Sequence, residues 1–247
     1  MTDKGIRKVV RTIPLSKKEV HKVAAERVAE IAREFTEGFK LLENYPRSVT
    51  FFGSRLVTED HPDYQDAREL SSRIVKELGY SIVSGGGPGI MEAADRGAFE
   101  VGGDSLGFLV QIPTGQPINA FLKKSMSFYY FFARKVCLAF GAEVFIFYPG
   151  GYGTLDEFFE IITLVQTNKI MGVPMICVGS EYWNKVKSFM EEELLSRGFI
   201  YENDLSLFTI TDNHDEIIDI IRKAPLREGI PFNGGEQIKV ATPSDQK

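Results

Sequence analysis

Short runs of apolar residues alternate along this chain with longer segments in which apolar residues recur every three or four positions. The short runs are typical of buried strands, because a parallel sheet with helices on both faces needs strands that are apolar on both sides. The longer segments are typical of amphipathic helices. Strands that alternate with helices predict a single α/β domain built on a doubly wound, Rossmann-like parallel sheet.

The N-terminal segment predicts a long helix that precedes the sheet. Ser16 followed by Glu19 is a capping-box pattern, and apolar residues at helical spacing continue over residues 17 to about 42. Residues 1–15 are rich in basic side chains and are expected to form a flexible arm. We therefore expect residues 1–45 to be an arm and a helix added to the domain.

The segments that follow predict the order of strands and helices in the domain. Residues 225–247 are interrupted by prolines and glycines and show little apolar periodicity, so we expect them to be a mobile tail. The Rossmann-like domain is then expected to span residues 46–224. Strands are expected at residues 48–52, 80–83, 105–110, 126–130, 142–148, 173–178 and 207–210, and helices at residues 62–78, 90–101, 131–140, 155–167, 182–195 and 215–223.

The balance of charge argues against binding of nucleic acid. The chain has 29 Lys and Arg residues against 34 Asp and Glu residues, which gives a net charge of −5. A chain that is acidic overall does not attract a polyanion by broad electrostatic capture. A local basic patch could still hold a small phosphate, so a small anionic ligand stays open.

No segment has the character of a membrane span. The longest apolar stretch, near residues 136–148, is interrupted by Gly141 and Glu143 and is shorter than the ~18 residues that a spanning helix needs. The N-terminus lacks the apolar region of a secretory signal. Cys137 and Cys177 lie in apolar runs, which favours reduced core thiols. We therefore expect a cytoplasmic protein with no membrane partner, and the widely spaced histidines predict no metal site.

Two glycine-rich turns follow predicted strands, SGGGPG at residues 84–89 and PGGYGT at residues 149–154. Ligands of such a sheet bind outside the carboxyl ends of its strands, and each turn can direct backbone N–H groups and a helix N-terminus at an anion. The glycines could instead serve only to permit a sharp change of direction. Two such turns in one sheet favour a phosphorylated ligand.

The familiar phosphate-binding motifs are not matched. Neither turn is followed by Lys-Ser or Lys-Thr, which argues against a Walker loop. A dinucleotide site normally has an acidic residue at the end of the next strand, where this chain has Gln111, so an NAD(P)-dependent oxidoreductase is a weak interpretation. Pyridoxal phosphate would need a lysine beside a histidine, and the pair His21-Lys22 lies far from both turns in the sequence. We therefore expect no cofactor.

A carboxylate and an arginine lie close to the second turn in the sequence. Thr154 and Glu157 fit a capping box, in which the glutamate only reaches back to the helix start. The apolar positions of that helix leave Glu157 on another side, so it could instead face a cleft. Arg134-Lys135 stands in a strongly apolar and aromatic segment. The pair could be a solvated helix edge or could bind an anionic substrate.

Taken together, these residues resemble the LONELY GUY (LOG) family, whose members are often misnamed lysine decarboxylases. The family hallmark P-G-G-x-G-T-x-x-E stands here at residues 149–157, with Arg134-Lys135 upstream. The turn GGGPGIM at residues 85–91 is similar to the family's GGG-x-x-G-hydrophobic-Met turn, shortened by one residue. Residues 52–54 look like the end of its first strand.

The resemblance implies a Rossmann-like dimer that hydrolyses the N-glycosidic bond of a nucleoside 5′-monophosphate and releases the free base and ribose 5-phosphate. It implies a reaction without a metal, with Arg134 and Glu157 as the catalytic pair. Together with the glycine turns, it implies a set of residues that line the substrate site. These are Gly53, Ser54, Gly86, Gly87, Lys135, Gly150, Gly151, Tyr152, Gly153, Thr154 and Thr163.

The resemblance leaves the base open. The plant-type pattern is Met-His-x-Arg-Lys, whereas this chain has Phe131-Phe132-Ala133 before Arg134. AMP-like nucleotides and cytokinin riboside monophosphates are both candidate substrates. The alternative is a non-catalytic protein that binds or carries a nucleotide or the molybdenum cofactor, because related folds bind that cofactor. A homodimer or a higher homo-oligomer is expected.

Overall fold

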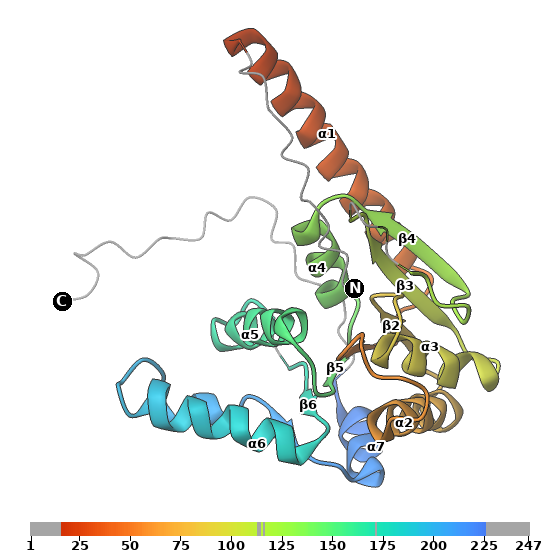
Figure 1. Ribbon diagram of the computed structural model, residues 1–247, viewed down its shortest axis with the longest axis vertical. Coiled ribbons are helices and arrows are strands. Elements are labelled where there is room, and N and C mark those ends of the chain that lie inside the picture. Colours follow the sequence, from red (N-terminus) through yellow and green to blue (C-terminus); the bar gives the residue numbers. More distant parts are fainter. Residues whose placement is uncertain (1–15, 113–114, 116, 171, 226–247) are drawn as a thin grey trace, which may run out of the picture.

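A computed structural model of the chain confirms the predicted α/β fold (Figure 1). Within the described residues, seven parallel strands form one sheet that has helices on both faces. No helix in this part of the chain is long and apolar enough to cross a membrane. The structure describes residues 16–112, 115, 117–170 and 172–225.

The predicted arm and nearly all of the predicted tail, residues 1–15 and 226–247, lie outside the described residues. The division of the chain into residues 1–45, 46–224 and 225–247 therefore stays a prediction.

Most strands are short buried runs, as the apolar pattern predicts. The strands are β1 (Ser48–Phe52), β2 (Ser81–Ser84), β3 (Ser105–Val110), β4 (Lys124–Phe128), β5 (Val144–Phe147), β6 (Met175–Cys177) and β7 (Thr209–Ile210). The α-helices are α1 (Lys17–Leu42), α2 (Pro62–Leu78), α3 (Ile90–Glu100), α4 (Phe131–Phe140), α5 (Tyr152–Gln166), α6 (Ser180–Phe189) and α7 (His214–Lys223). A π-helical segment, Met190–Leu195, continues α6, and a 3₁₀ segment, Glu202–Ser206, precedes β7.

Strand β1 lies in the middle of the sheet, whose order is β4-β3-β2-β1-β5-β6-β7. The chain moves outward from β1 to β4 on one side and then returns to place β5, β6 and β7 on the other side. The strand order therefore reverses between β1 and β5, which pair in parallel through residues 49–52 and 144–147. In an open α/β sheet, such a switch point is where ligands bind, outside the carboxyl ends of the strands.

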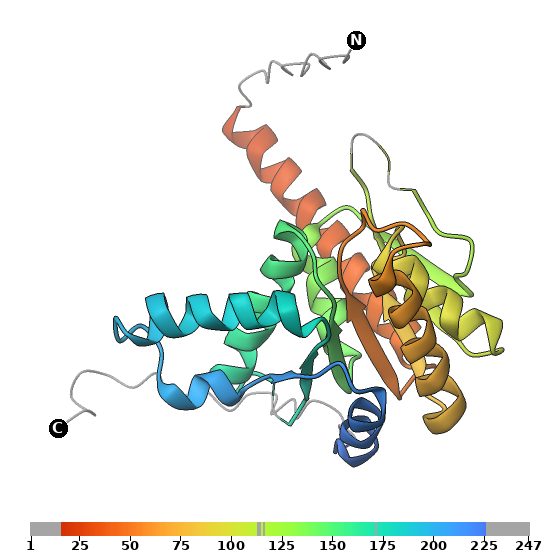
Figure 2. The same ribbon diagram turned by 60° about the horizontal axis from the view of Figure 1, so that its bottom comes forward.

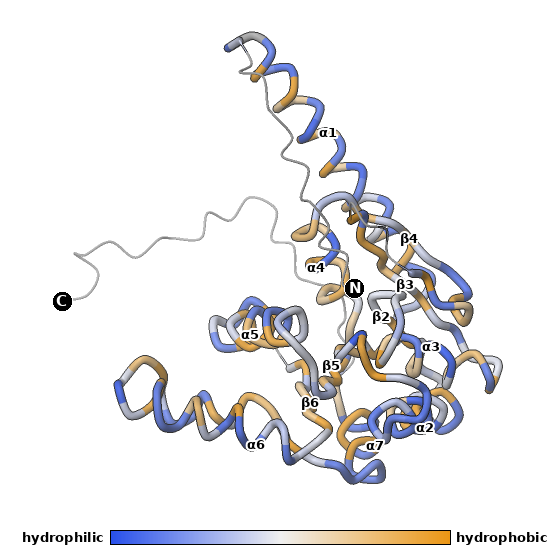
Figure 3. The backbone as a smooth tube through the Cα atoms, viewed as in Figure 1, coloured by the Kyte–Doolittle hydropathy of each residue, from blue (hydrophilic) through white to orange (hydrophobic). Residues whose placement is uncertain are grey.

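An apolar core lies on each face of the sheet. Successive side chains of a strand point to opposite faces, so Phe51 packs with α2, α3 and α7, whereas Phe52 packs with α4, α5 and α6. Figure 3 shows this arrangement as hydrophobic colour on β5 and β6 and as hydrophilic colour on the outer sides of the helices. The two cores together fix the strand ends that carry the glycine turns.

Helix α1 is attached to the domain through its C-terminal half. The predicted capping box of Ser16 and Glu19 is present at its start. Its N-terminal half projects away from the sheet (Figures 1 and 2). Farther along, the fully buried Glu34 accepts hydrogen bonds from the backbone N–H groups of Tyr129 and Tyr130, directly before α4.

Among the element boundaries that differ from the predicted ones, those of β4 and α6 have visible reasons. β4 begins at Lys124 and not at residue 126, because it pairs with β3 along its whole length even though much of it is exposed. α6 begins at Ser180 and not at residue 182, because the carboxylate of Asp212 accepts hydrogen bonds from the N–H groups of Gly179 and Ser180. Neither change alters the order of the elements.

Candidate active site

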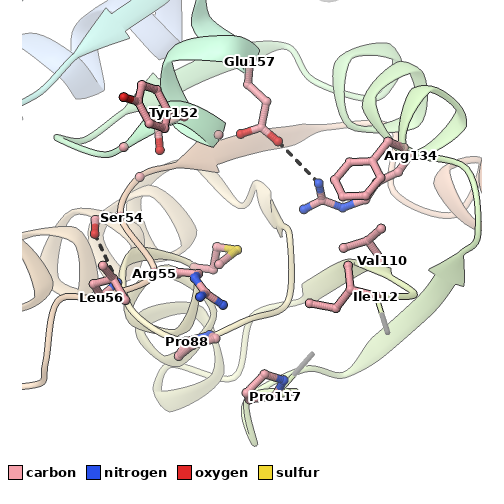
Figure 4. Close-up of a pocket in the computed structure, with 16 residues that line it drawn as sticks. Ser54, Arg55, Leu56, Pro88, Val110, Ile112, Pro117, Arg134, Tyr152 and Glu157 are labelled. Atoms are coloured by element: carbon pink, nitrogen blue, oxygen red, sulfur yellow. Dashed lines mark hydrogen bonds and ion pairs between the residues drawn. The ribbon is translucent and has the colours of Figure 1, made fainter. Parts of the chain in front are cut away.

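A pocket of about 350 Å³ opens at the switch point, between the ends of β1 and β5 (Figure 4). Its volume is in the range of small-molecule sites. Polar groups from α4, α5 and the end of β1 line it together with apolar side chains (Figure 4). The sequence-predicted residues that line it are Gly53, Ser54, Arg134, Gly151, Tyr152, Gly153, Thr154 and Glu157.

The N-terminus of α5 forms one end of this pocket. Gly151 is the N-cap residue, and among the described residues no side chain caps the helix. The first helical hydrogen bond runs from the N–H of Leu155 to the carbonyl of Gly151. The N–H groups of the first helical residues are therefore outside the helical hydrogen-bond pattern, and together with the helix dipole they form an anion-binding end.

The predicted capping box of Thr154 and Glu157 is wrong. α5 begins at Tyr152, not at residue 155, so Thr154 is already inside the first turn of the helix. Gly150 permits this early start, since a Cβ there would lie 2.2 Å from Oγ1 of Thr154. The side chain of Glu157 therefore does not cap the helix, and its carboxylate faces the pocket (Figure 4).

Arg134 and Glu157 form an ion pair within the pocket. Nη1 of Arg134 lies 3.4 Å from Oε1 of Glu157. The side chains are mostly buried, with exposed fractions of 10% for Arg134 and 17% for Glu157. Nε of Arg134 also donates to the carbonyl of Phe108 at 2.6 Å, which fixes the plane of the guanidinium.

Burial dominates the protonation of this pair. Removal from water raises the pKa of Glu157 to about 7, and the positive charge of Arg134 offsets this effect only in part. Burial also lowers the pKa of the Arg134 guanidinium, and the carboxylate opposes that shift. A carboxylate with a pKa near neutrality, next to a guanidinium in a pocket, is typical of a catalytic group.

The first glycine turn makes room for Arg134 and lines the pocket only through Pro88. A Cβ on Gly85 would lie 2.2 Å from Nη2 of Arg134, so the absent side chain makes room for the guanidinium. The N–H of Gly86 donates to Oγ of Ser84 at 2.9 Å, and the carbonyl of Gly87 accepts from Asn119. Gly86 and Gly87 are not among the residues that line the pocket, and their predicted part in holding a phosphate stays a prediction.

The other predicted site residues also lie outside the pocket lining. Nζ of Lys135 lies 2.9 Å from Asp156 and 2.7 Å from Glu160, so it joins the outer faces of α4 and α5. Thr163 is exposed farther along α5, and its hydroxyl donates to the carbonyl of Phe159 at 2.7 Å. Gly150 supports the turn, with its carbonyl accepting from the Tyr182 hydroxyl at 2.8 Å.

A protein-family model described as "Possible lysine decarboxylase" matches residues 91–221, which is more than half of the chain. The chain belongs to this family, the LOG family. A cytokinin riboside 5′-monophosphate phosphoribohydrolase of Arabidopsis thaliana, LOG5, is 25% identical over 190 residues, which are 74% of this chain and 82% of that protein. A probable enzyme of the same description from rice, LOG4, is 26% identical over 191 residues, which are 75% of this chain and 80% of that protein.

Solved structures share the fold of this LOG-family chain. The molybdenum cofactor binding protein of Rippkaea orientalis has a TM-score of 0.51 and 22% sequence identity. The alignment covers 71% of this chain and 93% of that one. At this identity the likeness shows the fold alone.

Sequence reasoning missed one polar residue of the LOG-family site. Arg55 follows the end of β1, and its guanidinium lies in the pocket across from Glu157 (Figure 4). The loop that carries it is held by Ser54, whose N–H donates to the carbonyl of Pro149 and whose carbonyl accepts from Ile90, both at 3.0 Å. A single arginine directly after a predicted Gly-Ser turn was the available signal.

The apolar wall of the pocket was also missed. It consists of side chains that are far apart in the sequence and that read as strand, helix and loop residues, so no local pattern joins them. In Figure 4, Val110 and Ile112 lie beside Arg134, and Pro117 lies farther from Glu157. Its members are Met91, Val110, Ile112, Pro117 and Phe131.

The described residues contain no group of three or more His, Cys, Asp or Glu side chains placed to hold a metal ion. The polar groups of the pocket are one carboxylate, two guanidiniums, three hydroxyls and the amides at the start of α5. This arrangement can bind an anion at one end, hold a planar apolar group at the other, and present an acid and a base between them.

Proposed function

We propose that this LOG-family protein hydrolyses the N-glycosidic bond of a nucleoside 5′-monophosphate, AMP-like or cytokinin-type, to the free base and ribose 5-phosphate. The observation that carries the proposal is the ion pair of Arg134 and Glu157, which is buried at a pocket where a helix N-terminus also opens. Curated relatives with this activity in their names, at 25% and 26% identity, support it.

The phosphate is held at the start of α5. The N–H groups of Tyr152, Gly153 and Thr154 supply partial positive charge there, and Arg55 supplies a full charge from the facing loop. A guanidinium can bind two phosphate oxygens at once. Fixing the phosphate at this end directs the anomeric carbon of the ribose toward Glu157.

The bond between the ribose and the base breaks beside the ion pair. As that bond lengthens, positive charge grows on the sugar, and the carboxylate of Glu157 stabilises it while accepting a hydrogen bond from water or a ribose hydroxyl. Arg134 stabilises the negative charge that the departing base gains. As the C–N bond breaks, the water oxygen bonds to the anomeric carbon and gives one proton to the carboxylate of Glu157. The leaving nitrogen takes up a proton from solvent, and Glu157 later returns its proton to solvent, so that one water molecule is added across the bond.

The base packs against the apolar wall. Val110 and Ile112 offer aliphatic surface to the face of a purine (Figure 4). Phe131 lines the same pocket and is 55% exposed, so an aromatic ring is available at the mouth. These contacts support a purine or an alkylated purine as the base, without selecting between them.

The test is to incubate the protein with AMP, GMP, CMP and a cytokinin riboside monophosphate, and to measure free base and ribose 5-phosphate. We expect release from at least one nucleotide, loss of release in Glu157→Gln, and near wild-type release in Glu160→Gln. Glu160 is a matched control, because it lies one turn farther along α5 and pairs with Lys135 outside the pocket lining. Equal activity of the wild type and Glu157→Gln would contradict the proposal.

The same experiment addresses the rival function, a carrier of a nucleotide or of the molybdenum cofactor. A carrier would bind its ligand without releasing base, so calorimetric binding of a nucleotide with no product from any substrate would favour it. In that case neither the wild type nor Glu157→Gln would release base, and the substitution would change only the affinity for the nucleotide.

We also propose that the protein is a homodimer or a higher homo-oligomer and that it works in the cytoplasm. Phe132, Val136 and Phe140 on α4 are 48%, 39% and 38% exposed, and an apolar surface of this kind is typical of a contact between proteins. The free thiols of Cys137 and Cys177 suit a reducing compartment. Light scattering should give at least two subunits for the wild type and a smaller assembly for Val136→Glu.

A further inference from the structure

Asp95 is a buried acid that the proposed mechanism does not use. It lies on α3 behind the first glycine turn and has no exposed surface. Its Oδ2 accepts hydrogen bonds from Oγ of Ser84 at 2.7 Å and from Nδ2 of Asn119 at 2.8 Å. Its Oδ1 has no hydrogen-bond partner among the described residues. A buried acid arranged in this way is costly to the fold, which suggests a role beyond packing.

Asn119 joins three parts of the chain around this acid. Its backbone N–H donates to the carbonyl of Gly86 at 3.1 Å, and its Nδ2 donates to the carbonyl of Gly87 at 3.1 Å as well as to Asp95. Its Oδ1 accepts from the N–H of Phe121 at 3.1 Å. The side chain is therefore bonded to α3, to the first glycine turn and to its own connection between β3 and β4.

That connection also carries part of the apolar wall. Ile112 and Pro117 line the pocket from it (Figure 4), and Pro117 stands directly before the segment that Asn119 anchors. The glycine turn to which Asn119 is bonded holds Gly85, which makes room for Arg134. The Asp95–Asn119 contact therefore links Ile112 and Pro117, the part of the apolar wall on this connection, to the turn that makes room for Arg134.

We propose that Asp95 is a positioning residue that, through Asn119, holds the apolar wall at the distance from Arg134 that the base requires. The inference rests on the proposed function, because it assigns the wall to the base. It predicts that the network governs affinity for the base and leaves the affinity for the sugar phosphate unchanged, since the start of α5 is not part of it.

The chemistry of the network defines a conservative variant. Burial raises the pKa of Asp95 to about 8, so near pH 7 the group is mostly neutral. Asparagine has the same shape and no charge, and its carbonyl oxygen can accept the hydrogen bonds from Ser84 and Asn119. Leucine has a similar volume but no acceptor, so the Ser84 hydroxyl loses its acceptor and Nδ2 of Asn119 keeps only the carbonyl of Gly87.

The test is a kinetic comparison of Asp95→Leu, Asp95→Asn and Asn119→Ala with AMP as the substrate and ribose 5-phosphate as a competitive inhibitor. For Asp95→Leu and Asn119→Ala we expect KM to rise at least tenfold, kcat to stay within about threefold, and the inhibition constant of ribose 5-phosphate to stay within twofold. Asp95→Asn should restore KM to within threefold of the wild type. Glu92→Gln is the control, because Glu92 lies on the same helix but bonds the Tyr64 hydroxyl.

A second measurement keeps the inference testable without turnover. Hydrogen exchange at the backbone amides of residues 119 and 121 should accelerate at least tenfold in Asp95→Leu. If Asp95→Leu does not fold, the same exchange rates are measured in Asn119→Ala. The double variant Asp95→Leu/Asn119→Ala should show no rise in KM beyond that of Asn119→Ala, because both substitutions break the same contact between residues 95 and 119. An unchanged KM, or equal losses for AMP and ribose 5-phosphate, would overturn the inference. An inactive wild type would instead contradict the proposed function, and Kd values for AMP would then replace KM.

Discussion

Nη1 of Arg134 lies 3.4 Å from Oε1 of Glu157, while Nε of the same arginine donates to the carbonyl of Phe108 at 2.6 Å. The short contact orients the guanidinium, and the longer one leaves the carboxylate free to accept a second, stronger hydrogen bond. The carboxylate of Glu157 can therefore accept a further hydrogen bond from a group in the pocket. Five expectations follow from this geometry and from the residues around it.

The activity should depend on pH through Glu157. Its pKa is raised to about 7, and the proposed role requires the carboxylate form. The value of kcat/KM should therefore fall about tenfold for each unit below pH 7 and level off above it. A profile that instead falls as the pH rises through 7 would show that the protonated acid is the active form.

The raised pKa of Glu157 should also affect the free energy of unfolding, which should fall as the pH rises, whereas the activity should increase. Because the folded-state pKa lies above the unfolded value, the folded protein binds more protons between about pH 4.5 and 7, and the free energy of unfolding decreases as the pH rises through that window. Denaturant unfolding of Glu157→Gln should lack this part of the pH dependence. Equal slopes for the wild type and the variant would contradict the assigned pKa.

Arg134 and Lys135 should differ sharply although they are adjacent. Arg134→Lys should lower kcat/KM at least 100-fold, because an ammonium cannot bond both Phe108 and Glu157 in the plane of a guanidinium. Lys135→Gln should keep kcat within about threefold and lower the free energy of unfolding by about 1 kcal/mol or less, as expected for ion pairs at a helix surface. Similar losses of activity for both variants would argue that Lys135 also contacts the substrate.

Gly85→Ala should damage the site without unfolding the protein. The added methyl group would lie 2.2 Å from Nη2 of Arg134 and 2.6 Å from the sulfur of Met91. The arginine must then move away from Glu157, so we expect kcat/KM to fall at least tenfold while the melting temperature changes by only a few degrees. A fully active Gly85→Ala protein would show that the guanidinium has another productive position.

Arg55→Gln should weaken binding of the phosphate. We expect KM for AMP to rise at least tenfold, with a much smaller effect on release of base from adenosine, which has no phosphate. Arg68 is a suitable control, because its guanidinium pairs with Glu100 at 2.7 Å on the outer side of α2 and α3. If Arg55→Gln and Arg68→Gln behaved alike, Arg55 would have no special role toward the ligand.

The sequence predicted the sheet and its glycine turns well, because these depend on local patterns. A buried run such as residues 144–147 can hardly be anything but a covered strand, and the hallmark at residues 149–157 identified the second turn and Glu157. The predicted start of α5 at residue 155 was wrong, because residues 152–154, Tyr-Gly-Thr, resemble a continuation of the glycine turn. In the structure Gly150 and Gly151 complete the turn alone, and Tyr152 already lies in the helix.

Contacts between distant segments could not be predicted from such patterns. Gly85 appeared to belong to a phosphate cradle, whereas its missing side chain accommodates an arginine from α4. Lys135 follows Arg134 in the sequence, but on a helix adjacent residues point in different directions, and the lysine meets α5 from outside. Both outcomes depend on how α3, α4 and α5 pack, which no single segment determines.

Glu34 connects the N-terminal helix to the segment before α4, although residues 16–42 precede the part of the chain that the family model matches. Its carboxylate receives the amides of Tyr129 and Tyr130, just ahead of the helix that carries Arg134. At Gly38 the two helices approach so closely that a Cβ would lie 2.6 Å from the sulfur of Cys137. A shortened protein that begins at residue 46 would therefore lose contacts that support α4 and the position of Arg134, so minimal versions of the protein should retain this helix.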